Sequence, residues 1–147
     1  MKDTVLTLAY VIKHGVNFED NLSYGGPYGQ GIVSYGEGDQ EELFSGLAYD
    51  LFPSGELECY LFVDKGVKEG VMVDFYSSGE VKSIHNMHKS ASYGDQFEFF
   101  ETGQLKRQEA RIAGVLMTYT EFNEQGAIVS EKRQPTKTDR LLAKKFG

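Results

Sequence analysis

The side chains best suited to metal or acid–base chemistry are the three histidines and the single cysteine of this 147-residue chain. His85 and His88 are the closest histidine pair, and His14 stands alone in a stretch predicted to be a loop. On a strand, residues three apart point to opposite faces, so this pair does not converge on one metal ion. We therefore expect surface positions for both histidines and no metal site.

Cys59 is the one thiol, and no histidine lies near it in sequence. We place it on the strand face that carries Leu57, Leu61 and Val63, where a small core residue is a better interpretation than a nucleophile. A single cysteine forms no internal disulfide, which is typical of a reducing compartment. We expect no catalytic residue and no cofactor, so an enzyme is disfavoured.

Residues 23–31 are rich in glycine and tyrosine, as a phosphate-binding loop is. They lack the Lys-Ser/Thr pair of such a loop, and no helical pattern follows that would present amides to an anion. We predict instead a solvated loop whose tyrosines pack on the end of a sheet.

The elements that must position these side chains follow a repeat of 24 residues. Gly46, Gly70 and Gly94 open successive units, and a second glycine follows each by nine residues, at Gly55, Gly79 and Gly103. Apolar residues recur at fixed offsets, as Tyr49, Val73 and Phe97 and as Leu51, Phe75 and Phe99. A shortened fourth copy keeps Phe122, Gly126 and Ile128. A fixed period of this size indicates a repeat architecture.

Each unit predicts a β-hairpin. Apolar residues alternate over five or six positions, which is typical of a half-buried strand, and a small or polar pair with glycine then marks a tight turn. Because a lone hairpin is marginal in water, the copies must pair with one another. We predict a mainly all-β fold, an elongated and twisted antiparallel meander of hairpins, with a short C-terminal helix.

The glycine and aromatic pattern resembles the variant MORN repeat over a little more than half of the chain. It is clearest at residues 70–82, where Phe75, Tyr76, Gly79, Val81 and Lys82 match, and it recurs at 94–106. The first unit keeps Leu51, Phe52, Gly55 and Leu57 but has Glu58 where lysine is usual. Bacterial proteins of this type include cytoplasmic antitoxins and immunity proteins, so the resemblance implies neutralisation of a cognate toxin.

The net charge of −7 is concentrated in the first half of the chain. Residues 1–66 contain eleven acidic and three basic residues, a balance of −8, whereas residues 67–147 contain twelve basic and eleven acidic residues, a balance of +1. This acidity disfavours generic nucleic-acid binding and favours a basic protein partner. The basic later strands are an alternative docking surface for an acidic partner.

We interpret residues 1–147 as one domain with three parts: an N-terminal strand with capping loops (1–45), the hairpin repeats (46–133) and a helix (134–147). Residues 4–12 predict a strand, with a short helix as the alternative, residues 13–31 a loop, and residues 32–35 a short strand. Thr136 and Asp139 have the spacing of a capping box, and Leu141 or Leu142 is expected to pack on a sheet edge or face. No apolar run approaches 20 residues and no signal-peptide pattern opens the chain, so a cytoplasmic location is expected.

Two groups of residues are candidates for partner binding. The acidic turn at 36–42 is either a solvated hairpin tip or a mimic of nucleic-acid phosphate. The recurrent acids should form a ladder across the units, and the aromatics that follow them lie on the face opposite Tyr49, Val73 and Phe97, either as core or as a partly open row. The candidates are Glu37, Asp39, Glu41, Glu42, Asp50, Phe52, Asp74, Tyr76, Glu98 and Phe100.

These observations favour a non-enzymatic protein-binding module, a bacterial immunity protein or antitoxin that covers the active site of a basic toxin such as a nuclease or another nucleic-acid-modifying enzyme. The alternative is a MORN-like structural scaffold or membrane-associated module, although acidity disfavours binding to anionic membranes. The sequence leaves open whether the sheet stays monomeric or pairs through an edge.

Overall fold

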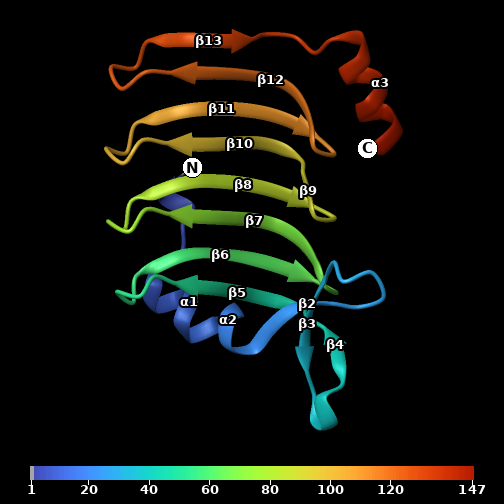
Figure 1. Cartoon of the computed structure of the whole chain (residues 1–147). Coiled ribbons are helices and arrows are strands. Elements are labelled where there is room, and N and C mark those ends of the chain that lie inside the picture. The colour runs from blue at the N-terminus through green and yellow to red at the C-terminus, as the bar shows by residue number, and fades with distance from the viewer. Residues whose placement is uncertain (1) are drawn as a thin grey trace.

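The computed structural model describes residues 2–147, and within these residues the strands form one sheet of ten strands and a second of three (Figure 1). The large sheet has the order β1-β5-β6-β7-β8-β10-β11-β12-β13, with the short β9 paired to β8. Its strands are β1 (Val16–Asn17), β5 (Gly46–Leu51), β6 (Leu57–Asp64), β7 (Val67–Phe75), β8 (Val81–His88), β9 (Ala91–Ser92), β10 (Gly94–Phe99), β11 (Leu105–Ile112), β12 (Val115–Phe122) and β13 (Ile128–Lys132). From β5 onward each strand lies beside the next in an antiparallel meander, as predicted, except that the short β9 pairs only with β8 and β10 follows β8 in the sheet.

The small sheet and the helices come from the flanking segments. Its antiparallel strands are β2 (Leu22–Gly25), β3 (Gly31–Tyr35) and β4 (Glu41–Leu43). The helical segments are η1 (Lys2–Thr4), α1 (Leu8–His14), α2 (Phe18–Asn21), η2 (Glu37–Asp39) and α3 (Lys137–Phe146). None of the described helices is both long and apolar enough to span a lipid bilayer.

The four hairpin turns of the repeat are built alike. In the second unit Tyr76 N donates to Glu80 O at 2.8 Å and Gly79 N donates to Tyr76 O at 2.9 Å, and the other three turns make the matching pair of bonds. Gly79 has φ 95°, a left-handed conformation that disfavours any residue with a Cβ. The predicted glycine turns are therefore confirmed.

A β-bulge accompanies every one of these turns, and it changes which side chains share a face. The register shifts between Asp50 and Leu51, and equivalently at Asp74/Phe75, Glu98/Phe99 and Glu121/Phe122. Cys59 pairs with Asp50, whereas Leu57 pairs with Leu51. We expected Leu57 to share the Cys59 face; that expectation is wrong, because the extra residue of the bulge moves Leu57 to the opposite side.

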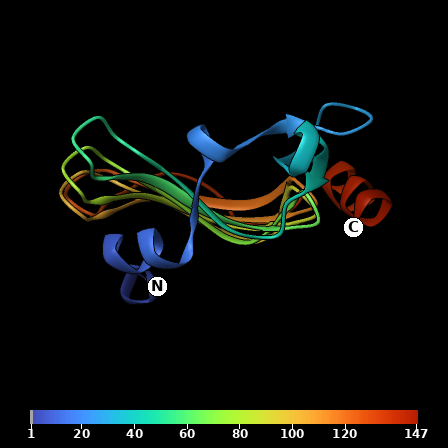
Figure 2. The ribbon, with the colours of Figure 1, turned by 90° about the horizontal axis from the view of Figure 1, so that it is seen from below.

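One side of the large sheet, which we call the α1 face, carries the larger core. Its buried residues include Tyr49, Val73 and Phe99, the alternating first-strand positions of the repeat, and they pack with Val11 of α1. Figure 2 shows α1 on this side and α2 with the small sheet on the other. The predicted shared face of the first-strand residues is confirmed.

The predicted strand at residues 4–12 is wrong, and the alternative of a short helix is correct. Thr7 caps α1 by accepting from Tyr10 N at 3.1 Å, and apolar residues spaced by three, Val5, Leu8 and Val11, turn toward the core. Leu6 N donates to the Tyr60 hydroxyl at 3.0 Å, which attaches the segment to the sheet. An almost continuous apolar run fits both the two-residue period of a strand and the longer period of a helix, so it does not by itself distinguish them.

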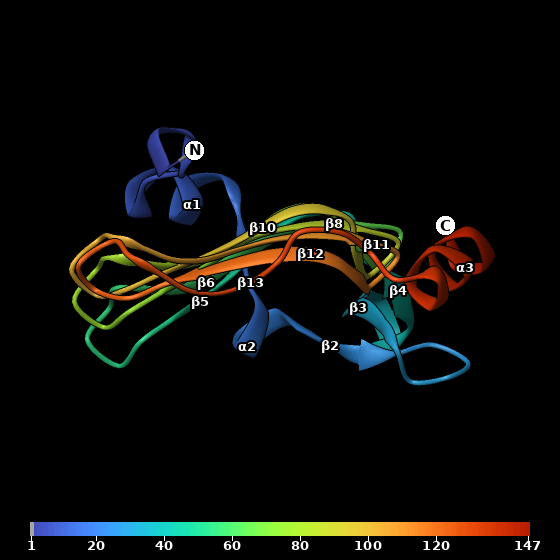
Figure 3. The ribbon, with the colours of Figure 1, turned by 90° about the horizontal axis from the view of Figure 1, so that it is seen from above.

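The opposite side, which we call the α2 face, is covered near β5 and β6 by α2 and the small sheet (Figure 3). Leu22, Ile32 and Phe44 pack there against Leu61 and Val63 of β6. Gly66 N donates to Phe44 O, and Gly66 O accepts from Ile32 N, so the small sheet is bonded to the β6–β7 loop. The predicted strand at 32–35 is confirmed within β3.

The loop predicted for residues 13–31 is wrong in most of its length. Val16 and Asn17 pair in parallel with Ala48 and Tyr49, and Asn17 then caps α2 by accepting from Asp20 N at 3.2 Å. The tyrosines also differ from the prediction, since Tyr28 is 88% exposed rather than packed on a sheet end. These contacts join segments about 30 residues apart, which local patterns do not report.

The C-terminal helix is confirmed, with its predicted capping box between Thr136 and Asp139. Its packing differs from the prediction. Ala143 is the buried residue of α3, whereas Leu141 and Leu142 are 60% and 39% exposed. The helix lies beyond the ends of the strands and touches β12, so a small residue makes the closest approach (Figure 2).

Candidate protein-binding surface

The predicted acidic ladder lies on the α2 face. Cys59 pairs with both Asp50 and Asp74, and Ser83 pairs with both Asp74 and Glu98, which places the three acids in one row across β5, β7 and β10. Ser83 Oγ donates to Asp74 Oδ2 at 2.8 Å. Glu98 in turn stands opposite Arg107 of β11. The row therefore runs from Asp50, which forms no ion pair within the described residues, past Asp74, whose Oδ2 lies 3.8 Å from His85 Nε2, to Arg107, which pairs with Glu121 of β12.

The aromatic residues Phe52, Tyr76 and Phe100 follow the three acids by two residues, where each strand enters its turn, and all three are half-buried. The Tyr76 hydroxyl donates to Phe99 O at 2.7 Å. Lys82 Nζ lies 5.8 Å from the Tyr76 ring centre, and Lys106 Nζ lies 5.7 Å from that of Phe100. Cations from the same sheet thus occupy positions over two of the three rings.

The acidic turn forms the end of the β3–β4 hairpin, which projects past the β5 edge of the large sheet (Figure 1). Glu37 and Asp39 lie in η2, and Glu41 and Glu42 lie on β4; all four are exposed. Glu41 Oε2 accepts from Gly26 N at 3.0 Å and so braces the hairpin. These four acids belong to the small sheet and are not part of the ladder row.

A groove of about 500 Å³ lies between α2, β2 and the first hairpin of the repeat. From α2 and β2 it is lined by Phe18, Glu19, Leu22, Ser23 and Tyr24, and from β5 and β6 by Asp50, Leu51 and Glu58. Glu19 N donates to Asp50 Oδ1 at 3.2 Å, which fixes α2 on β5. The sequence prediction included only Asp50 of this set.

One sequence signal did point to the groove. Glu58 stands where the second and third units carry Lys82 and Lys106, and that departure is visible without a structure. The remaining residues, Phe18, Glu19, Leu22 and Tyr24, come from the segment predicted to be a loop. Their position depends on the pairing of β1 with β5, so no local pattern could have found them.

The histidines do not come together at one site. His85 Nδ1 lies 3.1 Å from Gln96 Oε1, whereas the exposed His88 bonds to Glu69 at 2.9 Å. Among the residues that the structure describes, no group of three His, Cys, Asp or Glu side chains is placed to hold a metal ion.

The thiol of Cys59 is poorly suited to nucleophilic chemistry. Burial, followed by the charges of Asp50 and Asp74, raises its pKa to about 12. Because the thiolate is the reactive form, the group is protonated and inert near neutral pH.

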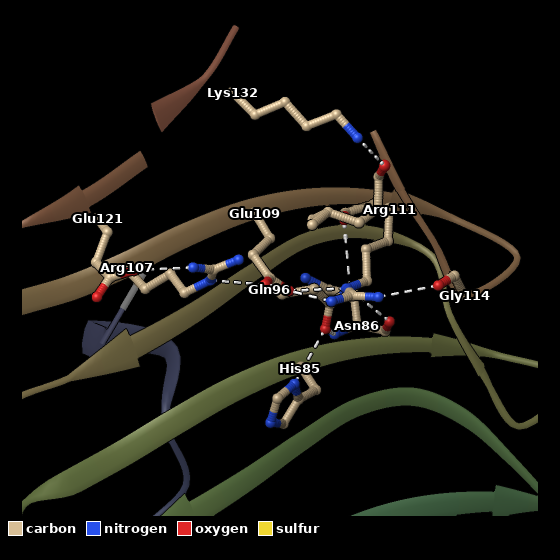
Figure 4. Close-up of polar contacts among 11 residues, drawn as sticks. His85, Asn86, Gln96, Arg107, Glu109, Arg111, Gly114, Glu121 and Lys132 are labelled. Carbon is tan, nitrogen blue, oxygen red and sulfur yellow. Dashed lines mark hydrogen bonds and ion pairs between the residues drawn. The ribbon is translucent and has the colours of Figure 1, made fainter. Parts of the chain in front are cut away.

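The later strands of the α2 face carry a connected polar network (Figure 4). Glu109 accepts from Arg107 Nε and Arg111 Nε, both at 2.7 Å, and Arg107 also donates to Glu121 at 3.0 Å. The Arg107 guanidinium stacks 4.0 Å from the Tyr119 ring centre. Burial acts to lower the pKa of Arg107, but its bonds to Glu109 and Glu121 outweigh this and raise the pKa.

The same network stabilises the ionised form of Glu109. Burial acts to raise the pKa of Glu109, but Arg111 and Arg107 outweigh it and lower the pKa. Buried Gln96 stands opposite Glu109 in the sheet and forms a separate set of bonds: it donates to Asn86 O at 2.9 Å and accepts from Asn86 N at 3.1 Å. The basic later strands, considered above as a docking surface for an acidic partner, thus have their arginines already paired.

The structure therefore brings Asp50, Asp74 and Glu98 together, sets Phe52, Tyr76 and Phe100 beside them, and keeps the acidic hairpin separate. Comparisons of the chain with protein-family models, with curated proteins and with solved structures gave no match.

Proposed function

We propose that this chain is a non-enzymatic protein-binding module that neutralises a basic toxin by covering its active site. One observation carries the proposal. The acids of the β3–β4 hairpin and of the groove form no ion pair with any basic side chain in the part of the chain that the structure describes. Unpaired acids on one side of a molecule repel each other and attract a cationic partner.

The shape of the acidic region supports the same proposal. The β3–β4 hairpin projects beyond the sheet edge and carries Glu37 and Asp39 at its end, where a partner can surround it (Figure 1). The resemblance of the repeat to variant MORN repeats of bacterial antitoxins and immunity proteins points in the same direction. A nuclease or another nucleic-acid-modifying enzyme is a fitting target, because its active site is built to bind phosphate.

The test is co-expression of the chain with the product of the gene adjacent to its own in a bacterial host, followed by binding measurements on the two purified proteins. We expect the chain to restore growth and to form a complex whose association rate falls with increasing salt. Failure of the unaltered chain to protect the cells or to bind would overturn the proposal.

A matched pair of triple variants separates the hairpin from net charge. Glu37→Gln, Asp39→Asn and Glu42→Gln neutralise three hairpin acids, and Asp95→Asn, Glu101→Gln and Glu124→Gln neutralise three exposed acids elsewhere. At low salt we expect about a tenfold slower association for the hairpin variant and a much smaller change for the control. Equal effects would mean that the hairpin has no special part.

A further inference from the structure

The groove under α2 has a lining that suits a planar cation. The rings of Phe18 and Tyr24 lie with centres 5.6 Å apart at 51°, and Tyr24 is 56% exposed. Leu22, which is buried, lines the same groove. The two rings beside this apolar side chain offer faces on which a flat group can stack.

Three acidic residues line the groove together with these rings. Asp50 and Glu58 come from β5 and β6, and Glu19 comes from α2. The ion pairs described for this protein lie elsewhere, and within residues 2–147 none involves Glu19, Asp50 or Glu58. Negative charge is therefore held beside the half-buried Phe18 ring and the exposed Tyr24 ring without an ion-paired cation from the described residues.

The internal repeat shows that this arrangement departs from the other units. At the matching position of the second and third units, Lys82 and Lys106 lie over Tyr76 and Phe100. The first unit keeps the aromatic Phe52 but has Glu58 in place of the lysine. The unit that lacks its own cation is also the one over which α2 and β2 form a groove.

We infer that this groove receives an arginine side chain from the protein partner, an assignment that rests on the proposed function. A guanidinium can stack on the Phe18 or Tyr24 ring and at the same time donate two parallel hydrogen bonds to one carboxylate. Lysine offers a compact charge that cannot form this planar pair of contacts. The partner of this surface is thus a basic protein that inserts an arginine between α2 and the first hairpin.

The first experiment uses a defined probe and the full chain. The peptide acetyl-Gly-Gly-Arg-Gly-Gly-amide is titrated against labelled protein, and amide shifts of residues 18–24, 50 and 58 are followed by NMR. The same peptide with citrulline or lysine replaces the guanidinium by a neutral or a compact group. We expect saturable shifts in the groove for arginine and at least tenfold weaker binding for both other peptides.

Glu58→Lys is the informative variant, because Lys82 and Lys106 show that the fold accepts lysine at this place in the repeat. We expect at least tenfold weaker binding of the arginine peptide with an unchanged unfolding midpoint. Glu101→Lys makes the same change in net charge at an exposed turn and should bind like the unaltered chain. Equal binding by Glu58→Lys, groove shifts that do not saturate, or equal affinity for the lysine peptide would overturn the inference.

The complex with the toxin distinguishes this inference from the proposed function. If the unaltered chain protects cells and Glu58→Lys protects equally well with unchanged affinity, the groove assignment fails while the neutralising function stands. If the unaltered chain binds no toxin but takes up the arginine peptide in the groove, the proposed function fails and the arginine site remains.

Discussion

The two ends of the α2 face differ in how their acidic side chains are paired. Near β11 and β12, acids and bases are interleaved, so Glu109 is held between Arg107 and Arg111 within the sheet. Near β5 and β6, the acids Asp50 and Glu58 share the groove with Glu19 and with aromatic and apolar side chains, and no basic side chain lines it. The β5–β6 end also carries α2 and β2, which come from outside the repeat, so the difference arises from side chains such as Glu58 and from the segment packed over them.

This contrast indicates that different residues determine the stability of the fold and the binding of a partner. Removing one member of a charge pair that is shielded from water leaves the other uncompensated and destabilises the fold, and such a pair has little charge left to offer a partner. Unpaired surface acids contribute little to the fold, and their charge is available for association. We therefore expect substitutions in the later strands to affect stability and those near α2 to affect binding.

The largest expected effect is on the free energy of unfolding of Glu109→Gln. Its carboxylate is 15% exposed and bonded to two arginines, so neutralising it leaves both guanidiniums with weaker partners. We expect a loss of about 2 kcal/mol, measured by urea denaturation. The matched change Glu58→Gln on the exposed side of β6 should alter stability by less than about 0.5 kcal/mol. Equal losses would remove the distinction between the two ends.

The sequence was informative about this architecture wherever the signal is local. Alternation and glycine turns identified the hairpins because neighbouring residues determine both, and Thr136 with Asp139 identified the start of α3. The row of Asp50, Asp74 and Glu98 also followed, since pairing of equal units aligns equal positions. The bulge that moves Leu57 away from the Cys59 face depends on the pairing register and was not visible.

The groove was beyond sequence reasoning for a different reason. Residues 13–31 contain no strong period, and their fold depends on the parallel pairing of Val16 with Ala48 and on Leu22 packing against the sheet. Local propensities say nothing of such long-range contacts. Glu58 was recognised as a departure from the repeat, but its meaning required α2 beside it.

A smaller effect is expected where α3 joins the later strands. Asp139 accepts from Lys132 Nζ at 2.6 Å and from Thr136 N at 2.7 Å, and the Lys132 bond followed by the Thr136 amide lowers its pKa to about 2. A carboxylate with a lowered folded pKa stabilises above its ordinary value of 3.8 and loses that contribution as pH falls through about 2.

The attachment of α3 should therefore weaken between pH about 4 and about 2. NMR signals of Ala143 and Lys132 followed over this range should report the release. In Asp139→Asn the two bonds to the carboxylate are already weakened, so α3 should be looser at pH 7 and the change between pH 4 and 2 should be smaller. An unaltered transition in that variant would mean that another acid controls the attachment.

The smallest expected effect is a change in the pKa of the Cys59 thiol, which responds to the unpaired charge of Asp50 near α2. Burial contributes most to its raised pKa, and Asp50 is the next cause, so Asp50→Asn should lower the pKa of the thiol. Alkylation by iodoacetamide at pH 8 is proportional to the thiolate fraction, and one pKa unit corresponds to a tenfold change in that fraction. We expect Asp50→Asn to react about threefold faster when folded and at the same rate as the unaltered chain in urea. Glu101→Gln neutralises an acid in another turn and should leave the alkylation rate of the folded protein unchanged. An equal increase in both variants would show that net charge, rather than the charge of Asp50, sets the pKa of the thiol.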